Sequence, residues 1–218
     1  MFSEWIRGGK PTKENQKFQW NEFVRQAKGE GASPTIEDRL EAMKWYVDST
    51  NIEKLGTGGS RAVFLLSSKS VLKVALHGFG IAQNKQEIEL SANASTEVPI
   101  ARVLTSDPDG LWLVAQLVRQ VKDEDEFASL VGYDLSEATE QVQYMFMDDK
   151  AGISLKREDY DPGIWMMWSA VKAGDLNLAD IEYLEHWGVN PDGEIVLLDY
   201  GFTNSMSAAS IKDMMKVQ

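Results

Sequence analysis

Three glycines and a lysine in the first half of the chain form the first group of residues that could do chemistry. Gly56, Gly58 and Gly59 stand between two strand-like runs, and Lys73 lies in the next run along, VLKVA. Glycine has no Cβ, so its backbone can approach a phosphate group and offer N–H donors. A lysine in an apolar strand is costly to bury unless it is paired or binds an anion. The pattern predicts a phosphate site, whereas the glycine turn alone would also fit an ordinary hairpin.

Two aspartates in the C-terminal part form the second group. Asp199 directly follows the apolar run IVLL and precedes Tyr200 and Gly201, and Asp180 lies 19 residues before it. Carboxylate oxygen is the ligand that a hard cation such as Mg²⁺ prefers, and Gly201 lets the chain turn away sharply. A plain Asp-x-Gly turn is the structural alternative. We favour the metal site because Lys73 is also present.

Strands and helices of ordinary length must position these residues. The apolar run AVFLL predicts a strand buried on nearly both faces, and the apolar stretch over 164–173 predicts a helix in the core of a second lobe. Thr35 and Asp38 resemble a capping box that begins an early helix. Strands are expected over 51–55, 61–67, 71–76, 98–105 and 111–118, helices over 81–93, 123–131, 135–147 and 207–218, and a strand pair around the turn NPDG.

Changes in composition divide the chain into three parts. Residues 1–50 are expected to form an N-terminal arm and helices, residues 51–120 a lobe built on the sheet, and residues 121–218 a reduced helical lobe. The polar stretch 1–16 contains two glycines and a proline, which predicts a flexible or docking arm.

The composition limits the classes of partner. A formal net charge of −12 argues against a protein that coats nucleic acid or an anionic membrane, because both repel an acidic surface. The chain contains no cysteine, which excludes disulfides and thiolate metal sites. No apolar run approaches the roughly 18 residues that span a bilayer, and the first residues lack the apolar core of a signal peptide. We therefore expect a soluble protein in the cytoplasm.

Taken together, the glycine turn, Lys73 in VLKVA and Asp199 in LLDYG resemble the protein-kinase-like superfamily. In that superfamily a glycine-rich loop covers ATP, a strand lysine grips the α- and β-phosphates, and the aspartate of D-F-G binds Mg²⁺. The resemblance implies an α+β, two-lobed fold, with a five-stranded antiparallel sheet in the first lobe and a reduced, mostly helical second lobe. It also implies ATP and Mg²⁺ as cofactors, with Gly56, Gly58 and Gly59 in the nucleotide site.

The resemblance implies a carboxylate partner for Lys73. A glutamate of the helix expected over 81–93 should pair with the lysine. Glu87 and Glu89 both lie there, but they are two residues apart and cannot face the same way. We favour Glu87, and we expect Glu89 to be a solvated helix carboxylate.

The run LVAQLVRQV, residues 113–121, takes the place of the hinge between the lobes. The backbone of such a hinge forms hydrogen bonds with the adenine ring in the superfamily. We expect residues 117–120 to do so here, with Gln116 and Val118 as candidate contacts.

The segment before Asp199 takes the place of the catalytic loop. Asp180 matches the aspartate that orients or deprotonates the acceptor hydroxyl. The fifth residue after it is Glu185, where the superfamily has a metal-binding asparagine, and a glutamate oxygen can also ligate Mg²⁺. Leu178 and Ala179 stand in place of the usual histidine and arginine, and His186 is expected to be structural.

Two further departures concern the glycine pattern and the length. Arg61 replaces the third glycine, and a side chain there is tolerated if it points away from the cleft. Few residues follow LDYGFT, so the activation segment and peptide-binding helices of full protein kinases are not expected. In its compactness and in the phrases AQNK, HWGV and LDYGFT, the chain is similar to short kinase-like proteins encoded by bacteriophages.

Two functions of different class follow from the resemblance. The first is an ATP·Mg-dependent phosphotransferase with Lys73 and Asp180 as catalytic residues and Asp199, with Glu185, as metal ligands. The second is a degenerate pseudokinase that serves as a structural or interaction component, for example of a phage virion. The expected partners are a nucleotide and, beyond it, a protein acceptor or other phage proteins, with the host cytoplasm or the virion as the location.

Overall fold

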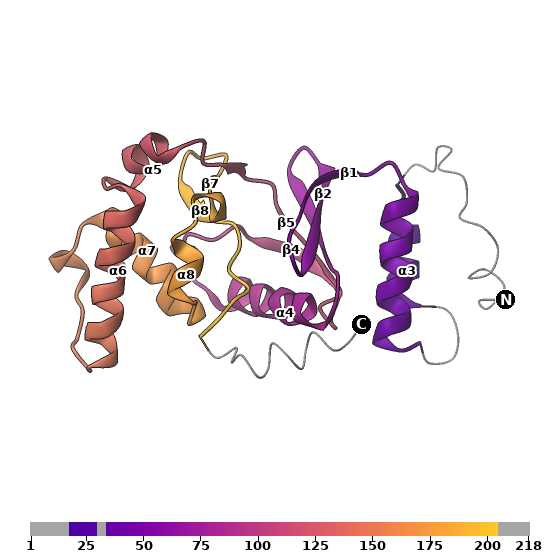
Figure 1. Cartoon of the computed structure of the whole chain (residues 1–218), viewed down its shortest axis with the longest axis horizontal. Helices are drawn as coiled ribbons and strands as arrows, with labels where there is room; N and C mark the ends of the chain where they lie inside the picture. The colour runs from indigo at the N-terminus through magenta and orange to yellow at the C-terminus, as the bar shows by residue number, and fades with distance from the viewer. Residues whose placement is uncertain (1–17, 30–33, 205–218) are drawn as a thin grey trace.

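The computed structural model describes residues 18–29 and 34–204. Within these ranges the chain forms a lobe built on a sheet and a lobe built mainly of helices, placed end to end in an elongated molecule (Figure 1). We call them the sheet lobe, which contains β1 to β5 and α2 to α4, and the helical lobe, which contains α5 to α8 and β6 to β8. The arm expected over 1–16 and the helix expected over 207–218 lie outside the described residues.

Two helices cover one face of the sheet lobe. These are α2 (Trp20–Lys28) and α3 (Ile36–Ser49). The predicted capping box begins α3, because the Thr35 hydroxyl accepts from the Asp38 N–H and the Asp38 carboxylate accepts from the Thr35 N–H. Buried side chains of both helices, including Phe23, Met43 and Tyr46, pack against the sheet.

The sheet has the strand order β1-β2-β3-β5-β4, and every neighbouring pair is antiparallel. β3 lies in the middle and is buried along its whole length. Because side chains alternate along a strand, Leu72 and Val74 face the helices α2 and α3, whereas Lys73 faces the opposite side. The strands are β1 (Glu53–Thr57), β2 (Arg61–Ser67), β3 (Ser70–Ala75), β4 (Val103–Ser106) and β5 (Trp112–Gln116).

The helix α4 (Gly78–Asn93) connects β3 to β4 and lies on the side of the sheet toward which Lys73 points. It begins three residues before the helix expected at 81. The strand expected from 98 is shorter than predicted, because β4 begins at Val103. Pro99 has no N–H to give to a ladder, and Ile100 instead forms a parallel bridge with Leu197 of the helical lobe.

The helical lobe packs around α7 (Pro162–Gly174), whose buried face includes Ile164, Met167, Trp168 and Val171. This confirms that the apolar stretch at 164–173 is a core helix. The other helices are α5 (Glu124–Val131), α6 (Leu135–Lys150), α8 (Leu178–Ile181), η1 (Arg157–Asp159) and η2 (Leu184–His186). Within the described residues no helix is long and apolar enough to cross a membrane.

A small antiparallel sheet joins the hinge to the helical lobe. It consists of β6 (Arg119–Gln120), β7 (Trp187–Val189) and β8 (Ile195–Leu197), in that order. Two backbone hydrogen bonds link Leu197 to the segment before β4, from Ala101 N to Leu197 O and from Leu197 N to Pro99 O. Asp199 therefore follows β8 directly at the boundary between the lobes.

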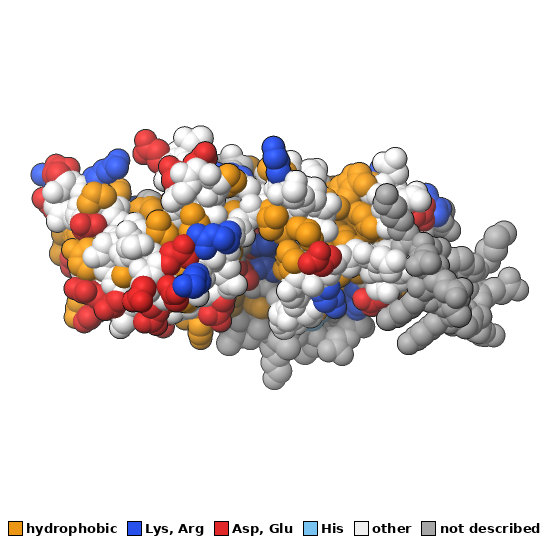
Figure 2. Space-filling model, turned by 90° about the horizontal axis from the view of Figure 1, so that it is seen from above, with side chains coloured by type: hydrophobic (Ala, Val, Ile, Leu, Met, Phe, Trp, Pro, Cys, Tyr) orange, Lys and Arg blue, Asp and Glu red, His pale blue; other side chains and the backbone are white. Residues whose placement is uncertain are grey.

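The topology confirms the two-lobed α+β fold class, with a five-stranded antiparallel sheet in the first lobe and a mostly helical second lobe. The view from above shows acidic side chains gathered over the helical lobe (Figure 2). This distribution is in keeping with the net charge of −12.

Candidate functional site

Lys73 and Glu87 form a buried ion pair between β3 and α4. The Lys73 Nζ lies 2.8 Å from Glu87 Oε2 and 3.0 Å from Glu87 Oε1. Lys73 is 8% exposed and Glu87 is 0% exposed, whereas Glu89 on the same helix is exposed. Removing two charges from water is expensive, so a buried pair of this kind is weak evidence for a purely stabilising role.

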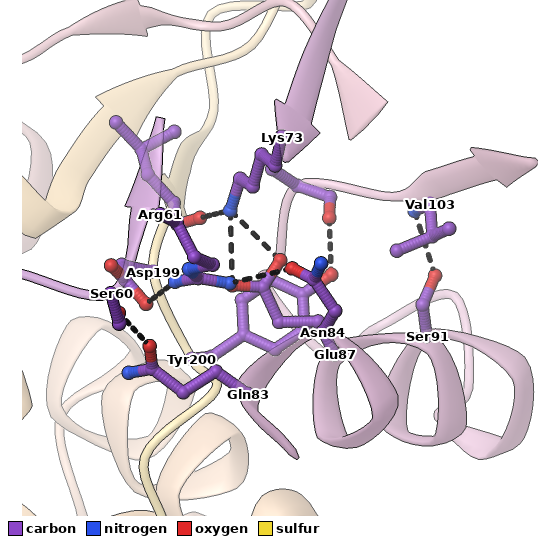
Figure 3. Close-up of polar contacts among 12 residues, drawn as sticks. Ser60, Arg61, Lys73, Gln83, Asn84, Glu87, Ser91, Val103, Asp199 and Tyr200 are labelled. Carbon is purple, nitrogen blue, oxygen red and sulfur yellow. Dashed lines mark hydrogen bonds and ion pairs between the residues drawn. The ribbon is translucent and has the colours of Figure 1, made fainter. Parts of the chain in front are cut away.

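Arg61, the first residue of β2, points into the same site. Its Nη1 lies 2.6 Å from Glu87 Oε1, and its Nη2 lies 2.5 Å from Asp199 Oδ1 (Figure 3). The arginine is only 5% exposed. The side chain therefore does not point away from the cleft, which was the condition under which a residue other than glycine was expected to be tolerated here. The guanidinium is held there because two carboxylates satisfy its charge.

Asp199 and the residue before it complete the cluster from the helical lobe. The Lys73 Nζ donates a hydrogen bond to the carbonyl oxygen of Leu198 at 2.8 Å. The Asp199 side chain remains 40% exposed, so solvent reaches its carboxylate. Two cations and two carboxylates from β2, β3, α4 and the segment after β8 thus meet at the lobe boundary. We call Arg61, Lys73, Glu87 and Asp199 the charged cluster.

The electrostatics of the charged cluster keep Asp199 ionised. Burial by itself disfavours the charged carboxylate, but the Arg61 guanidinium and then the Lys73 ammonium outweigh it and hold the pKa of Asp199 well below its usual range. For Arg61, burial opposes the charge, and Asp199 and Glu87 outweigh it, so its pKa lies above the ordinary value. The contact between Arg61 and Asp199 is therefore an ion pair at neutral pH.

Asp180 lies on α8 in the helical lobe, in a partly buried position. Burial, and next the negative charge of Asp199, raise the pKa of Asp180 from 3.8 to about 6. Its backbone carbonyl lies 2.7 Å from His186 Nδ1, which agrees with a structural role for that histidine. The structure thus places Asp180 within electrostatic reach of Asp199.

Glu185 does not join Asp199 through a direct contact. Its side chain is exposed, and its backbone carbonyl accepts a hydrogen bond from Gln120 Nε2. Across residues 18–29 and 34–204, no group of three or more Asp, Glu or His side chains is arranged to hold a metal ion. One oxygen of Asp199 is also bound by Arg61. The residues as arranged do not fit Mg²⁺, and the assignment of Asp199 and Glu185 as its ligands stays a prediction.

The glycine turn is fastened to the segment that follows β3 and to the first turns of α4. The Leu76 N–H donates to the Ser60 carbonyl at 2.8 Å, and His77 Nε2 lies 2.9 Å from the Gly59 carbonyl. The Ser60 hydroxyl also forms a hydrogen bond with the Gln83 side chain (Figure 3). The carbonyls of this turn therefore face α4, on the same side of the sheet as Lys73.

The three glycines singled out in the sequence are not required by the fold. Gly56 lies in β1 opposite Val63, and the Gly58 N–H donates to the Arg61 carbonyl at 2.9 Å. Within the part of the chain that the structure describes, a Cβ added at Gly56 or Gly59 would meet no atom within 4 Å, and one added at Gly58 would meet only the Arg61 carbonyl at 3.9 Å. None of the three has a left-handed backbone. Among the described residues, the space beside Gly56 and Gly59 is therefore open.

The two hinge candidates, Gln116 and Val118, lie in different surroundings. The Gln116 N–H donates to the Arg102 carbonyl at 2.8 Å and is therefore engaged within the sheet lobe. Val118 lines a depression of about 400 Å³. Its other walls come from the hinge and from the turn between β7 and β8, namely Leu117, Arg119, Val189, Asn190 and Pro191.

The structure adds site residues that the sequence did not reveal. Asn84 lies next to Arg61, with its Oδ1 3.4 Å from Arg61 Nη1. Tyr200 is fully buried, and its ring centroid lies 5.9 Å from Lys73 Nζ. Arg61 could have been found by the argument used for Lys73, because it too is a cation at the start of an apolar strand. Asn84 carries no comparable signal.

The comparisons with known proteins are sparse. No protein-family model matches the chain, and no curated protein matches it. Among solved structures, the GDP complex of wild-type aminoglycoside 2'-phosphotransferase-IIIa is similar with a TM-score of 0.37 and 15% identity, over 70% of this chain and 67% of that chain. SAICAR-synthase from Saccharomyces cerevisiae, complexed with SAICAR, is similar with a TM-score of 0.32 and 10% identity, over 68% of this chain and 73% of that chain. Structural similarities this weak do not show what this chain binds.

Proposed function

We propose that the protein binds a nucleoside triphosphate, ATP in the first instance, between its two lobes. The observation that supports this best is the position of Lys73. Its ammonium is buried at the lobe boundary, on the strand paired with the one that follows the glycine turn, and within electrostatic reach of Asp199, whose carboxylate solvent can reach. The charge of this ammonium is balanced by Glu87, and it can bind an anionic ligand by exchanging one of its present acceptors for a phosphate oxygen.

In this proposal Lys73 holds the α- and β-phosphates, and Glu87 keeps the ammonium in place. The backbone at Gly56, Gly58 and Gly59 approaches the phosphates from the sheet side. The adenine lies against the hinge, with Val118 and its depression as the nearest site and Gln116 as a flanking residue. Phosphate recognition by fixed N–H groups and a lysine is a common arrangement for nucleotides.

Binding requires one rearrangement of Lys73. An ammonium has three N–H donors, and here two contact Glu87 while the third contacts the Leu198 carbonyl. A phosphate oxygen must therefore replace one of these acceptors. We propose that it replaces the Leu198 carbonyl, because the bond to Glu87 is charge-assisted and stronger.

Phosphoryl transfer to a hydroxyl acceptor is the further step of this proposal. Asp180 would act as the base, and its pKa of about 6 suits proton acceptance near neutral pH. Transfer in this form would also place Mg²⁺ at Asp199 and Glu185, which the present arrangement does not fit.

A second candidate is nucleotide binding without transfer, in a pseudokinase that acts as a structural or interaction component, for example of a phage particle. The specific observation in its favour is the Arg61–Asp199 ion pair, which engages the carboxylate that transfer would require.

The test is thermal unfolding of the full chain with and without ATP. ATP should raise the Tm of the wild-type protein, and Lys73→Met should remove the shift. Lys69→Met is the matched control, because Lys69 is exposed in the turn between β2 and β3. No shift in the wild-type protein would refute nucleotide binding.

A second readout needs no variant. An acyl-phosphate derivative of ATP transfers its acyl group to a lysine beside the phosphates, and peptide mass spectrometry identifies the lysine. Lys73 should be labelled and Lys69 should not. Transfer of the γ-phosphate of ATP, abolished in Asp180→Asn, would favour the phosphotransferase, whereas binding without transfer would favour the second candidate.

A further inference from the structure

Arg61 contacts both carboxylates of the charged cluster. One edge of its guanidinium contacts Glu87 from α4, and the other edge contacts Asp199 from the helical lobe, 138 residues away in the sequence. Asn84 lies beside it at 3.4 Å. Its backbone is fixed as well, because Arg61 pairs with Ala75 at the edge of the β2–β3 ladder. The guanidinium is therefore a fixed positive charge in contact with the Asp199 carboxylate.

A divalent cation at Asp199 would compete with this contact. Mg²⁺ requires near-octahedral oxygen coordination at about 2.1 Å, and Arg61 already occupies Oδ1 of Asp199, so this carboxylate has only Oδ2 left to offer the ion. The ion would also lie close to Arg61 and Lys73, and like charges in a partly buried site repel strongly. Glu87 cannot compensate, because both cations already contact it.

A guanidinium can itself bind a phosphate group. It is planar, it remains charged at all physiological pH values, and its donors match the geometry of phosphate oxygens. We propose that Arg61 takes the place of Mg²⁺ beside Asp199, so that the site binds the phosphates of its nucleotide without a divalent cation. This inference rests on the proposed nucleotide binding and deepens it by assigning the cation that accompanies the phosphates.

The wild-type protein tests the inference first, by calorimetric titration with ATP in EDTA and in excess MgCl₂. The Kd should differ by less than about threefold between the two conditions, because Arg61 supplies the charge in both. Binding that is lost in EDTA and restored by Mg²⁺ would overturn the inference and leave nucleotide binding intact. The absence of binding in both conditions would refute the proposed function, and this inference with it.

Substitution of Arg61 provides the second test. Arg61→Gln should weaken ATP binding in EDTA by about tenfold or more, and Mg²⁺ should restore part of the loss, because the carboxylate of Asp199 becomes free. Arg25→Gln is the matched control. Arg25 is an ion-paired arginine on α2, outside the charged cluster, and its removal should leave the EDTA titration unchanged.

A metal readout without nucleotide completes the design. Mn²⁺ added to the protein is followed by electron paramagnetic resonance, in which protein-bound Mn²⁺ loses the signal of the free ion. The wild-type protein should leave the signal unchanged, Arg61→Gln should bind Mn²⁺, and Arg61→Gln/Asp199→Asn should not. Mn²⁺ binding by the wild-type protein that Asp199→Asn removes would overturn the inference. If Arg61→Gln does not fold, Arg61→Lys replaces it, and weaker ATP binding in EDTA is again expected.

Discussion

The Lys73 ammonium donates a hydrogen bond to the Leu198 carbonyl oxygen 2.8 Å away, and this bond joins the middle strand of the sheet lobe to the segment that carries Asp199. The two residues are 125 positions apart in the sequence. Together with the Arg61–Asp199 pair, this bond means that the charged cluster also connects the lobes. The charged cluster therefore helps to fix the position of the sheet lobe relative to the helical lobe.

The Lys73–Glu87 pair should be energetically coupled. Lys73→Met should lower the free energy of unfolding by about 1–3 kcal/mol, because the fully buried Glu87 carboxylate loses one of its two cations. Urea unfolding followed by tryptophan fluorescence measures the change. In a double-mutant cycle with Glu87→Gln the two costs should be clearly less than additive.

The exposed Lys69→Met serves as the control for this cycle and should change the free energy of unfolding by less than about 0.5 kcal/mol. Fully additive costs for Lys73→Met and Glu87→Gln would contradict the pairing.

Asp180 should make stability depend on pH. The folded protein raises the pKa of this carboxyl from 3.8 to about 6, so between these pH values the folded state binds more protons than the unfolded state. The contribution of Asp180 to stability is therefore fully present below about pH 4, decreases as the pH rises to about 6, and is constant above. Asp180→Asn should be more stable than the wild-type protein at pH 8, by about 1–2 kcal/mol, and the gain should vanish near pH 4.

Urea unfolding at several pH values measures this difference, and Glu182→Gln, an exposed carboxylate two residues away, should show no such trend. A gain for Asp180→Asn that is equal at pH 4 and pH 8 would show that the charge of Asp180 is not its cause.

Two glycines near the turn should respond differently to alanine. A Cβ at Gly80 would lie 2.1 Å from the Ser60 carbonyl oxygen, so Gly80→Ala must displace the turn from α4 and should cost about 1–3 kcal/mol. A Cβ at Gly59 would meet no atom within 4 Å, and Gly59→Ala should change stability by less than about 0.5 kcal/mol. The same variant should weaken ATP binding if a phosphate lies beside this glycine.

Thermal unfolding with and without ATP measures both effects. A Gly59→Ala protein with unchanged stability and unchanged ATP binding would remove this glycine from the proposed site.

Tyr200 should contribute through its hydroxyl as well as its ring. The hydroxyl donates to the Ala101 carbonyl at 2.5 Å, and the side chain is fully buried. Tyr200→Phe leaves that carbonyl without this donor and should cost about 1–2 kcal/mol. Tyr144→Phe removes an exposed hydroxyl that donates to Glu140, and should cost far less. Equal costs in urea unfolding would contradict the role of the buried bond.

Local sequence patterns predicted much of the fold. The capping box at Thr35, the strands around Lys73 and the apolar helix α7 all depend on residues close together in the chain, which is why their types and spacing were sufficient. The beginning of β4 was predicted too early, because an apolar run does not show that Ile100 pairs with Leu197 across the lobe boundary.

The site was harder to predict than the fold. Lys73 and Asp199 stood out because a charge within or directly after an apolar strand is unusual. The direction of the Arg61 side chain depends on a carboxylate 138 residues away, which no local pattern contains. The resemblance to protein kinases was also misleading at this position. It treats Arg61 as the replacement of a glycine, whereas in the structure the guanidinium pairs with Glu87 and Asp199.

The attachment of the glycine turn to α4 has a consequence for the thermodynamics of ligand binding. Hydrogen bonds that the turn forms with Leu76, His77 and Gln83 already fix it before any ligand arrives. A free loop loses conformational entropy when it closes over a ligand, and this loss weakens affinity. Here that loss occurs during folding, so the turn is preorganised and binding should proceed with little ordering of the backbone.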